Sequence, residues 1–141
     1  MPINVLLVED NPGDRRLVLE CLKEAGDNTA LTAVADGVEA MDFLRRKGCY
    51  AGAARPDVIF LDLGLPRKDG HQVLAEIKAA PELKGIPVVV VTGSSADEDV
   101  SRAYDLHANC YATKPIALEQ FAVVMKAIES FWLGIVTLPP K

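Results

Sequence analysis

The sequence lacks the features that would point to a membrane, to secretion or to nucleic acid. No apolar run in its 141 residues approaches the roughly 20 residues needed to cross a bilayer. Its first ten residues carry two acids and no basic residue, so they do not look like a signal peptide. Positive charge is not in excess, since 15 Lys and Arg against 20 Asp and Glu give a formal net charge of −5. This balance argues against a tight, sequence-independent hold on nucleic acid, which needs many cationic contacts with phosphate.

Cysteine is also scarce, and the chain is short. Cys21, Cys49 and Cys110 are scattered and odd in number, which fits a reducing cytoplasm better than a disulfide framework. The sequence has no internal repeat, low-complexity stretch or linker. Its length, with 50% apolar and 25% charged residues, predicts one globular domain with a real core and no separate effector module. We expect this domain over residues 1–133 and a tail over 134–141.

Short apolar runs predict buried β-strands. They are rich in β-branched residues and bounded by Pro, Gly, Asn or Asp, as in a parallel sheet that helices cover on both faces. The runs lie at residues 5–8, 58–61 and 88–91, with weaker candidates at 31–34 and 110–112.

Apolar stripes at the helical period alternate with these runs. The first expected helix covers the stripe from Leu17 to Ala25. The second is opened by Asp36 and ends near Gly48, and the third is opened by Asp69 and ends before Pro81. The fourth is capped by Ser94, Ser95 or Asp97 and runs toward His107, and the fifth runs from Pro115 to about Leu133. Strand and helix therefore alternate five times. This order predicts an α/β fold with a doubly wound, five-stranded parallel sheet and right-handed crossovers.

Polar residues collect where the predicted strands end. Glu9 and Asp10 follow the run at 5–8, and Asp62 follows the run at 58–61. Thr92 follows the run at 88–91, and Lys114 comes soon after the run at 110–112. Each has a simpler explanation when taken singly, as a helix cap, a solvated loop residue or a turn. Because the carboxyl ends of the strands line the ligand-binding crevice of an open α/β sheet, the five together favour a site.

The charges of this set point to a metal ion and a phosphoryl group. Glu9, Asp10 and Asp62 carry three negative charges against the single positive charge of Lys114. Carboxylates at that density repel one another and take up protons unless a divalent cation joins them. A hard cation that prefers oxygen, Mg²⁺ above all, brings the local charge to zero. The arrangement suits in-line attack by Asp62 on a phosphoryl donor, with the metal and Lys114 stabilising the phosphoryl oxygens.

With these residues in these positions, the sequence resembles the receiver domain of two-component response regulators. The matching segments are Val8 to Pro12, Phe60 to Pro66 with Asp69-Gly70, Val91 to Gly93, and Tyr111 to Pro115. The resemblance spans residues 3 to about 132 and implies the flavodoxin-like strand order 2-1-3-4-5. It implies a phosphoacceptor at Asp62 and no DNA-binding output in a chain of this length.

The resemblance also implies roles for the neighbouring residues. Mg²⁺ would be held by the side chains of Asp10 and Asp62, by the backbone carbonyl of Gly64 and by Glu9 through a water molecule. Many receivers carry a larger side chain at position 64, so the glycine leaves the phosphoryl group more open to water.

Three further residues would read the phosphoryl group. The resemblance implies that Lys114 and Thr92 contact its oxygens and that Tyr111 rotates inward as the switch aromatic. The alternative for Tyr111 is an aromatic ring that merely caps the edge of the sheet.

A narrower resemblance links the chain to small stand-alone receivers that partner phytochrome histidine kinases. It lies in Leu106 to Pro115, in Ile128 to Leu133 and in Val136 to Pro139. It implies a phytochrome-type sensor kinase as phosphodonor and a homodimer, with signalling through protein contact or phosphorelay to a further histidine. Residues 117–133 hold more apolar side chains than one sheet-facing stripe needs, which favours a dimer interface through this helix and the tail. The alternative is a tail that folds back over its own helix.

Two other functions use a similar arrangement of residues or the same architecture. A Mg²⁺-dependent aspartyl-phosphate phosphohydrolase also uses a strand-end Asp, but it usually has a second Asp two residues later, where this chain has Gly64. His71 and His107, expected on helix surfaces, do not take over that role. A flavodoxin-like electron carrier needs a hydroxyl- and glycine-rich phosphate loop after the first strand, where Glu9 and Asp10 would repel a flavin phosphate.

Overall fold

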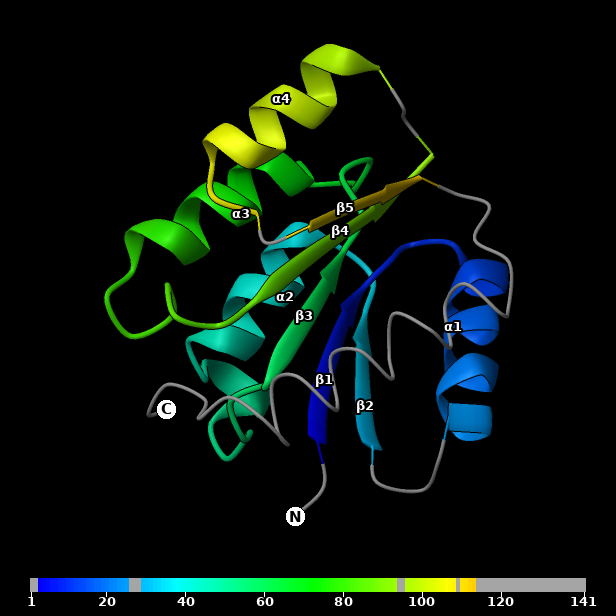
Figure 1. Cartoon of the computed structure of the whole chain (residues 1–141). Coiled ribbons are helices and arrows are strands. Elements are labelled where there is room, and N and C mark those ends of the chain that lie inside the picture. Colours follow the sequence, from blue (N-terminus) through cyan, green and yellow to red (C-terminus); the bar gives the residue numbers. More distant parts are fainter. Residues whose placement is uncertain (1–2, 26–28, 94–95, 109, 114–141) are drawn as a thin grey trace, which may run out of the picture.

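The computed structural model describes residues 3–25, 29–93, 96–108 and 110–113 of the chain. They contain a sheet of five parallel strands in the order β2-β1-β3-β4-β5 (Figure 1). The strands are β1 (Ile3–Val8), β2 (Thr29–Val34), β3 (Val58–Leu61), β4 (Val88–Thr92) and β5 (Cys110–Thr113). The chain adds β2 on one side of β1 and the later strands on the other. The predicted doubly wound α/β fold is therefore confirmed.

Helices cover both faces of the sheet. The helical elements are α1 (Pro12–Ala25), α2 (Gly37–Leu44), the short 3-10 helix η1 (Gly48–Tyr50), α3 (Gly70–Ala79) and α4 (Asp97–Asp105). Figure 1 shows α1 on one side of the sheet and α2, α3 and α4 together on the other. None of the helices in this part of the chain is long and apolar enough to span a membrane. The helix expected from Pro115 to about Leu133 and the tail over 134–141 lie outside the described residues.

The central strands are buried on both faces, as their uninterrupted apolar runs predict. One face packs against α2 and α3 through alternate residues, among them Leu6, Ile59 and Val88. The residues between them, such as Leu7 and Phe60, point to the other face and are at most 3% exposed. β3 is therefore held rigidly in the middle of the sheet, and the position of its last residue is well fixed.

β2 behaves differently because it is an edge strand. Ala30, Thr32 and Ala33 are exposed, and Val34 is the one fully buried residue among those of β2 whose side chains are described. This explains why its apolar run is weaker in the sequence than those of β1, β3 and β4.

Capping side chains define the starts of α2 and α3, but not that of α4. Asp36 accepts a hydrogen bond from the Glu39 amide at 2.8 Å and caps α2. Asp69 forms a capping box with Gln72 at the start of α3, as the Asp-Gly pair predicts. The predicted cap by Asp97 is wrong, because Asp97 is the first residue of α4 and the capping position is held by Ala96, which has no side-chain acceptor. Ser94 and Ser95 lie outside the described residues.

Candidate functional site

The first two acids lie in the turn between β1 and α1. Glu9 and Asp10 follow the last residue of β1, and α1 begins with Pro12. Asn11 fixes this start, because its Oδ1 accepts hydrogen bonds from the amides of Gly13 at 2.8 Å and Asp14 at 3.1 Å. An Asn cap followed by Pro at the first helical position is a strong helix-start signal. The turn therefore presents both acids at the carboxyl end of the sheet.

The third acid belongs to the neighbouring strand. β1 and β3 pair in parallel with Val8 opposite Leu61, and the Asp62 amide donates to the Val8 carbonyl at 3.0 Å. Asp62 therefore lies beside the start of the Glu9–Asp10 turn, although 52 positions separate it from Asp10 in the sequence.

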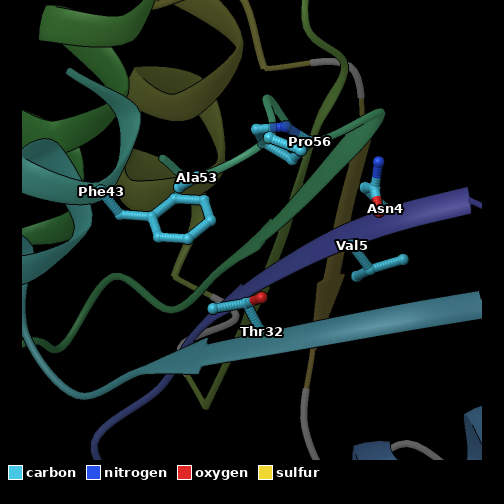
Figure 2. Close-up of a pocket in the computed structure, with 7 residues that line it drawn as sticks. Asn4, Val5, Thr32, Phe43, Ala53 and Pro56 are labelled. Carbon is cyan, nitrogen blue, oxygen red and sulfur yellow. The ribbon is translucent and has the colours of Figure 1, made fainter. Parts of the chain in front are cut away.

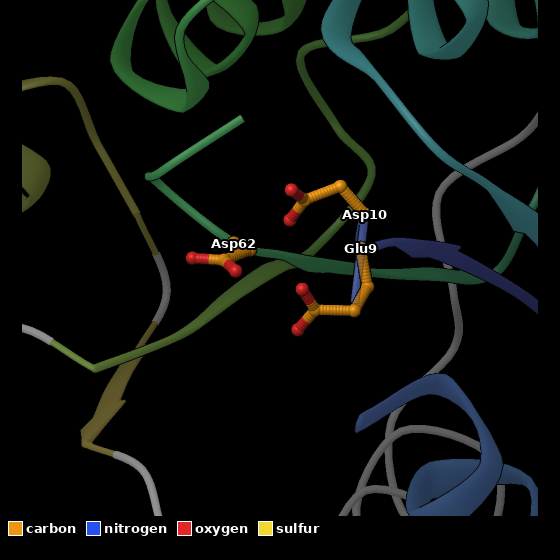
Figure 3. Close-up of side chains that lie close together, drawn as sticks. All are labelled: Glu9, Asp10 and Asp62. Carbon is orange, nitrogen blue, oxygen red and sulfur yellow. The ribbon is translucent and has the colours of Figure 1, made fainter. Parts of the chain in front are cut away.

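The three carboxylates face one small space (Figure 3). One oxygen from each of Glu9, Asp10 and Asp62 lies within 4.8 Å of the oxygens of the other two. Glu9 and Asp62 are buried, at 3% and 8% exposure, while Asp10 is exposed and leaves the space open to solvent. Three anionic groups this close repel one another, and a divalent cation relieves that repulsion. The all-oxygen donor set fits a hard cation such as Mg²⁺, Mn²⁺ or Ca²⁺.

Gly64 lies next to the Asp62 side chain. Its amide donates to Asp62 Oδ1 at 3.1 Å, and a Cβ atom built on it would stand 4.0 Å from the same oxygen. A larger side chain at this position would therefore lie against the carboxylate. Gly64 itself is exposed, so this neighbour of the buried Asp62 carboxylate borders on solvent.

Gly70 is a structural part of the site that sequence reasoning treated only as a helix opener. A Cβ atom on Gly70 would stand 2.3 Å from the Asp62 carbonyl oxygen and 2.5 Å from Leu63 Cα. The first residue of α3 is therefore pressed against the end of β3, which only glycine permits. The Asp69-Gly70 pair was the available signal, but its close approach to Asp62 is a tertiary feature.

The remaining site residues lie on β4 and β5. Thr92 is the last residue of β4 and is 4% exposed. It pairs with Thr113 at the end of β5, so the strand ends are level at this edge of the sheet. Tyr111 lies in β5 opposite Val90, and its side chain is not described. Lys114 lies outside the described residues.

The two histidines differ from expectation. His71 is 5% exposed in the first turn of α3, where its Nδ1 lies 3.5 Å from Asp69 Oδ1. The expected surface position is therefore wrong for His71. It precedes Leu74, which is fully buried, by three residues, and this spacing could have indicated an inward-facing side chain. His107 is exposed but follows α4 in a left-handed conformation rather than lying on the helix.

A small pocket lies near the other end of β1 (Figure 2). It has a volume of about 160 Å³ and is lined by Asn4, Val5, Thr32, Phe43, Ala53, Ala54 and Pro56. Its residues come from the first half of β1, from β2, from α2 and from the loop before β3. It is separate from the carboxylates, which follow the last residue of β1.

Comparisons with known proteins agree with this geometry. The response regulator receiver domain family matches residues 5–126. Response regulator Rcp1 of Synechocystis sp. is 51% identical over 138 residues, which are 98% of this chain and 94% of that protein. Among solved structures, the phosphorylated cyanobacterial phytochrome response regulator RcpA is 50% identical, with a TM-score of 0.88 over 99% of this chain and 100% of that one. The Mn²⁺-bound form of Rcp1 is also 50% identical, with a TM-score of 0.86 over the same shares of the two chains.

A family match over most of the chain and an identity of 51% over nearly all of it leave no ambiguity about descent. The chain belongs to the response regulator receiver domain family and is a response regulator homologous to the phytochrome response regulator Rcp1.

Proposed function

We propose that this response regulator accepts a phosphoryl group on Asp62 from a phytochrome-type sensor histidine kinase, in a reaction that depends on Mg²⁺. One observation carries the proposal: the carboxylates of Glu9, Asp10 and Asp62 converge within 4.8 Å at the carboxyl ends of β1 and β3. Two homologues support it, since RcpA has been solved in a phosphorylated form and Rcp1 in a Mn²⁺-bound form.

The chemistry is an in-line phosphoryl transfer. A carboxylate oxygen of Asp62 attacks phosphorus and forms the new P–O bond, while the P–N bond to the kinase histidine breaks. The released imidazole nitrogen takes a proton from solvent. In this proposal Lys114, which follows the β5 segment in the sequence, neutralises a phosphoryl oxygen, and Thr92 donates its hydroxyl hydrogen to another.

The proposed metal site combines Asp62 with the two acids of the turn after β1. Asp10 and Asp62 would hold Mg²⁺ through their side chains and Gly64 through its carbonyl oxygen, and Glu9 would act through a water molecule. When bound, the ion neutralises charge that develops on the phosphoryl oxygens. The chain itself supplies the orientation of Asp62, through the hydrogen bonds from the Asp62 amide to Val8 and from the Gly64 amide to Asp62 Oδ1.

The output is a change of contacts rather than catalytic turnover. Thr92 moves toward the phosphoryl group and lets Tyr111 rotate inward, which alters the surface beside β5. We assign homodimer formation to residues 117–141. The phosphorylated protein then signals by binding a cytoplasmic target protein or by passing the phosphoryl group to a histidine phosphotransfer partner. In this assignment the protein is a phosphoprotein, not an enzyme with an external substrate, and it binds neither nucleic acid nor membrane.

Acetyl phosphate labelling tests the proposal. Wild-type protein with MgCl₂ should take up at most one phosphoryl group per chain, in an acid-stable and base-labile linkage. Excess EDTA or the substitution Asp62→Asn should abolish the label. Asp105→Asn, the same change at the exposed end of α4, is the matched control and should label normally. Full labelling of Asp62→Asn would refute the assignment of the phosphoacceptor.

The same experiment separates a response regulator from a phosphohydrolase. The proposed function predicts a burst of one equivalent followed by slow release of phosphate. Steady release of many equivalents per chain, with no stable label, would instead support a phosphohydrolase. Labelling by a phytochrome kinase with ATP, compared with an unrelated histidine kinase, tests the identity of the donor.

A further inference from the structure

The loop that follows the phosphoacceptor is tied to the start of α2 by one buried carboxylate. Asp36 is 8% exposed, and its two oxygens have different partners. Oδ1 accepts the Glu39 amide at 2.8 Å and caps the helix, while Oδ2 lies 3.2 Å from Arg67 Nη1. The capping residue of α2 therefore also holds a residue that is 31 positions away in the sequence.

The backbones of the two segments are in contact beside this ion pair. A Cβ atom on Gly37 would stand 2.1 Å from the Lys68 carbonyl oxygen, so the first residue of α2 packs directly on the loop. Lys68 is held from its other side, because its Nζ donates to Glu76 of α3. Residues 67 and 68 are thus fixed between two helices.

The same loop is fixed at its beginning. The Leu63 carbonyl accepts hydrogen bonds from the amides of Leu65 and Gly70, both at 3.0 Å. The Lys68 amide donates to the Pro66 carbonyl at 2.7 Å. Gly64 therefore lies in a short turn whose two ends are anchored, one on β3 and the other on α2.

Arg67 holds a backbone conformation that is unfavourable for it. Its φ is +65°, in the left-handed region that favours glycine. Such a conformation persists in a residue with a side chain when surrounding contacts enforce it. The hydrogen bond from the Lys68 amide to the Pro66 carbonyl closes a tight turn around Arg67, and the ion pair with Asp36 holds its side chain, which is otherwise largely exposed.

We infer that Asp36 and Arg67 are positioning residues for the metal-binding carbonyl of Gly64. They touch neither the metal nor the phosphoryl group, and they act by fixing the path of residues 64–67. This inference rests on the proposed function, in which the Gly64 carbonyl is a ligand of Mg²⁺. Its consequence is that the metal affinity of the site depends on a contact with α2, outside the acidic cluster.

Substitutions on the two sides of the pair distinguish positioning from simple electrostatics. Removing a cation near a cation site should tighten Mg²⁺ binding through Coulomb forces, and removing an anion should weaken it. Positioning predicts that Arg67→Ala and Asp36→Asn both weaken Mg²⁺ binding, by about two- to fivefold for a partly exposed ion pair. Asn keeps an oxygen for the Glu39 amide, so Asp36→Asn leaves the helix cap in place. The double variant should be no weaker than the weaker single variant.

Arg46→Ala is the matched control. Arg46 is an exposed arginine at the other end of α2 with a φ of +57°, so the substitution removes the same charge from the same backbone conformation. It should leave Mg²⁺ binding unchanged. Arg67→Lys keeps the positive charge and should recover part of the lost affinity.

The measurement is a titration of each variant with MgCl₂, followed by amide shifts in NMR spectra at about 0.15 M salt, where distant charges are screened. Labelling by acetyl phosphate at saturating MgCl₂ should stay within about twofold of wild type, because positioning affects occupancy of the metal site. Unchanged or tighter binding in Arg67→Ala would overturn the inference while leaving the proposed function intact. If wild-type protein bound no Mg²⁺ and took no label, the proposed function would fail as well.

Discussion

Replacement of Gly70 by alanine should damage both the stability and the chemistry of this protein. The new Cβ atom would stand 2.3 Å from the Asp62 carbonyl oxygen, whereas real Cβ atoms essentially never come within 3.0 Å of a non-bonded heavy atom outside their own and the adjacent residues. Both close neighbours, the Asp62 carbonyl and Leu63 Cα, are backbone atoms and cannot rotate away. The end of β3 and the start of α3 must therefore separate by at least about 0.7 Å.

Two opposing effects set the magnitude for stability. Overpacking of this kind costs about 1–3 kcal/mol, whereas alanine in a helix is favoured over glycine by about 0.5–1 kcal/mol. The net loss should be about 1–2 kcal/mol, which lowers the Tm of a domain of this size by roughly 3–8 °C. Because a 1 Å misplacement of a reacting group can cost about 100-fold in rate, labelling by acetyl phosphate should slow by roughly ten- to a hundredfold.

Thermal unfolding by circular dichroism and a time course of labelling measure the two effects. Gly52→Ala is the matched control, because a Cβ atom on Gly52 meets nothing within 4 Å. It should leave both the Tm and the labelling rate near wild type. A Gly70→Ala protein that unfolds and labels like the Gly52→Ala protein would refute the reasoning.

Three further predictions concern other parts of the chain. Burial lowers the pKa of the Lys78 ammonium below its usual 10.5. Between the lowered pKa and 10.5 the unfolded chain binds more protons than the folded one, so the free energy of unfolding should rise with pH in that window. Lys78→Met should flatten this rise, as measured by urea unfolding at several pH values. Thr92→Ala should leave labelling of Asp62 within about threefold of wild type while abolishing the phosphorylation-dependent change in the NMR signals of the Tyr111 ring; a retained change would contradict the coupling. Truncation after Gly134 should weaken self-association in sedimentation equilibrium without lowering Tm, and a full chain that stays monomeric at high micromolar concentration would rule out the homodimer.

Local sequence patterns were sufficient for the five strands and for α1 to α4 of this fold, but not for the short helix η1. The uninterrupted apolar runs of β1, β3 and β4 correspond to strands that are buried on both faces, a property of the strand itself once helices cover the sheet. Asp36 and Asp69 were identified as helix starts because a capping hydrogen bond involves only the next few residues. The same locality allowed the acids and Thr92 to be assigned to strand ends. The prediction of the α4 cap was wrong because the capping position holds Ala96, whose side chain cannot accept a hydrogen bond. The start of α4 is therefore not set by a local capping side chain.

Tertiary structure decided everything that joins distant segments. The convergence of Glu9 and Asp10 with Asp62 depends on β1 and β3 being neighbours in the sheet. The apolar pattern of a strand does not encode its neighbours, so the strand order was expected from the family resemblance alone. The burial of His71, the contact of Gly70 with the end of β3 and the pair formed by Asp36 with Arg67 are likewise set by how helices pack on the finished sheet. The sequence alone determined which residues reach the carboxyl edge of the sheet, because that depends on where each strand ends. Which of them touch, and what holds them in place, followed only from packing, because those distances arise between segments that meet when the chain folds.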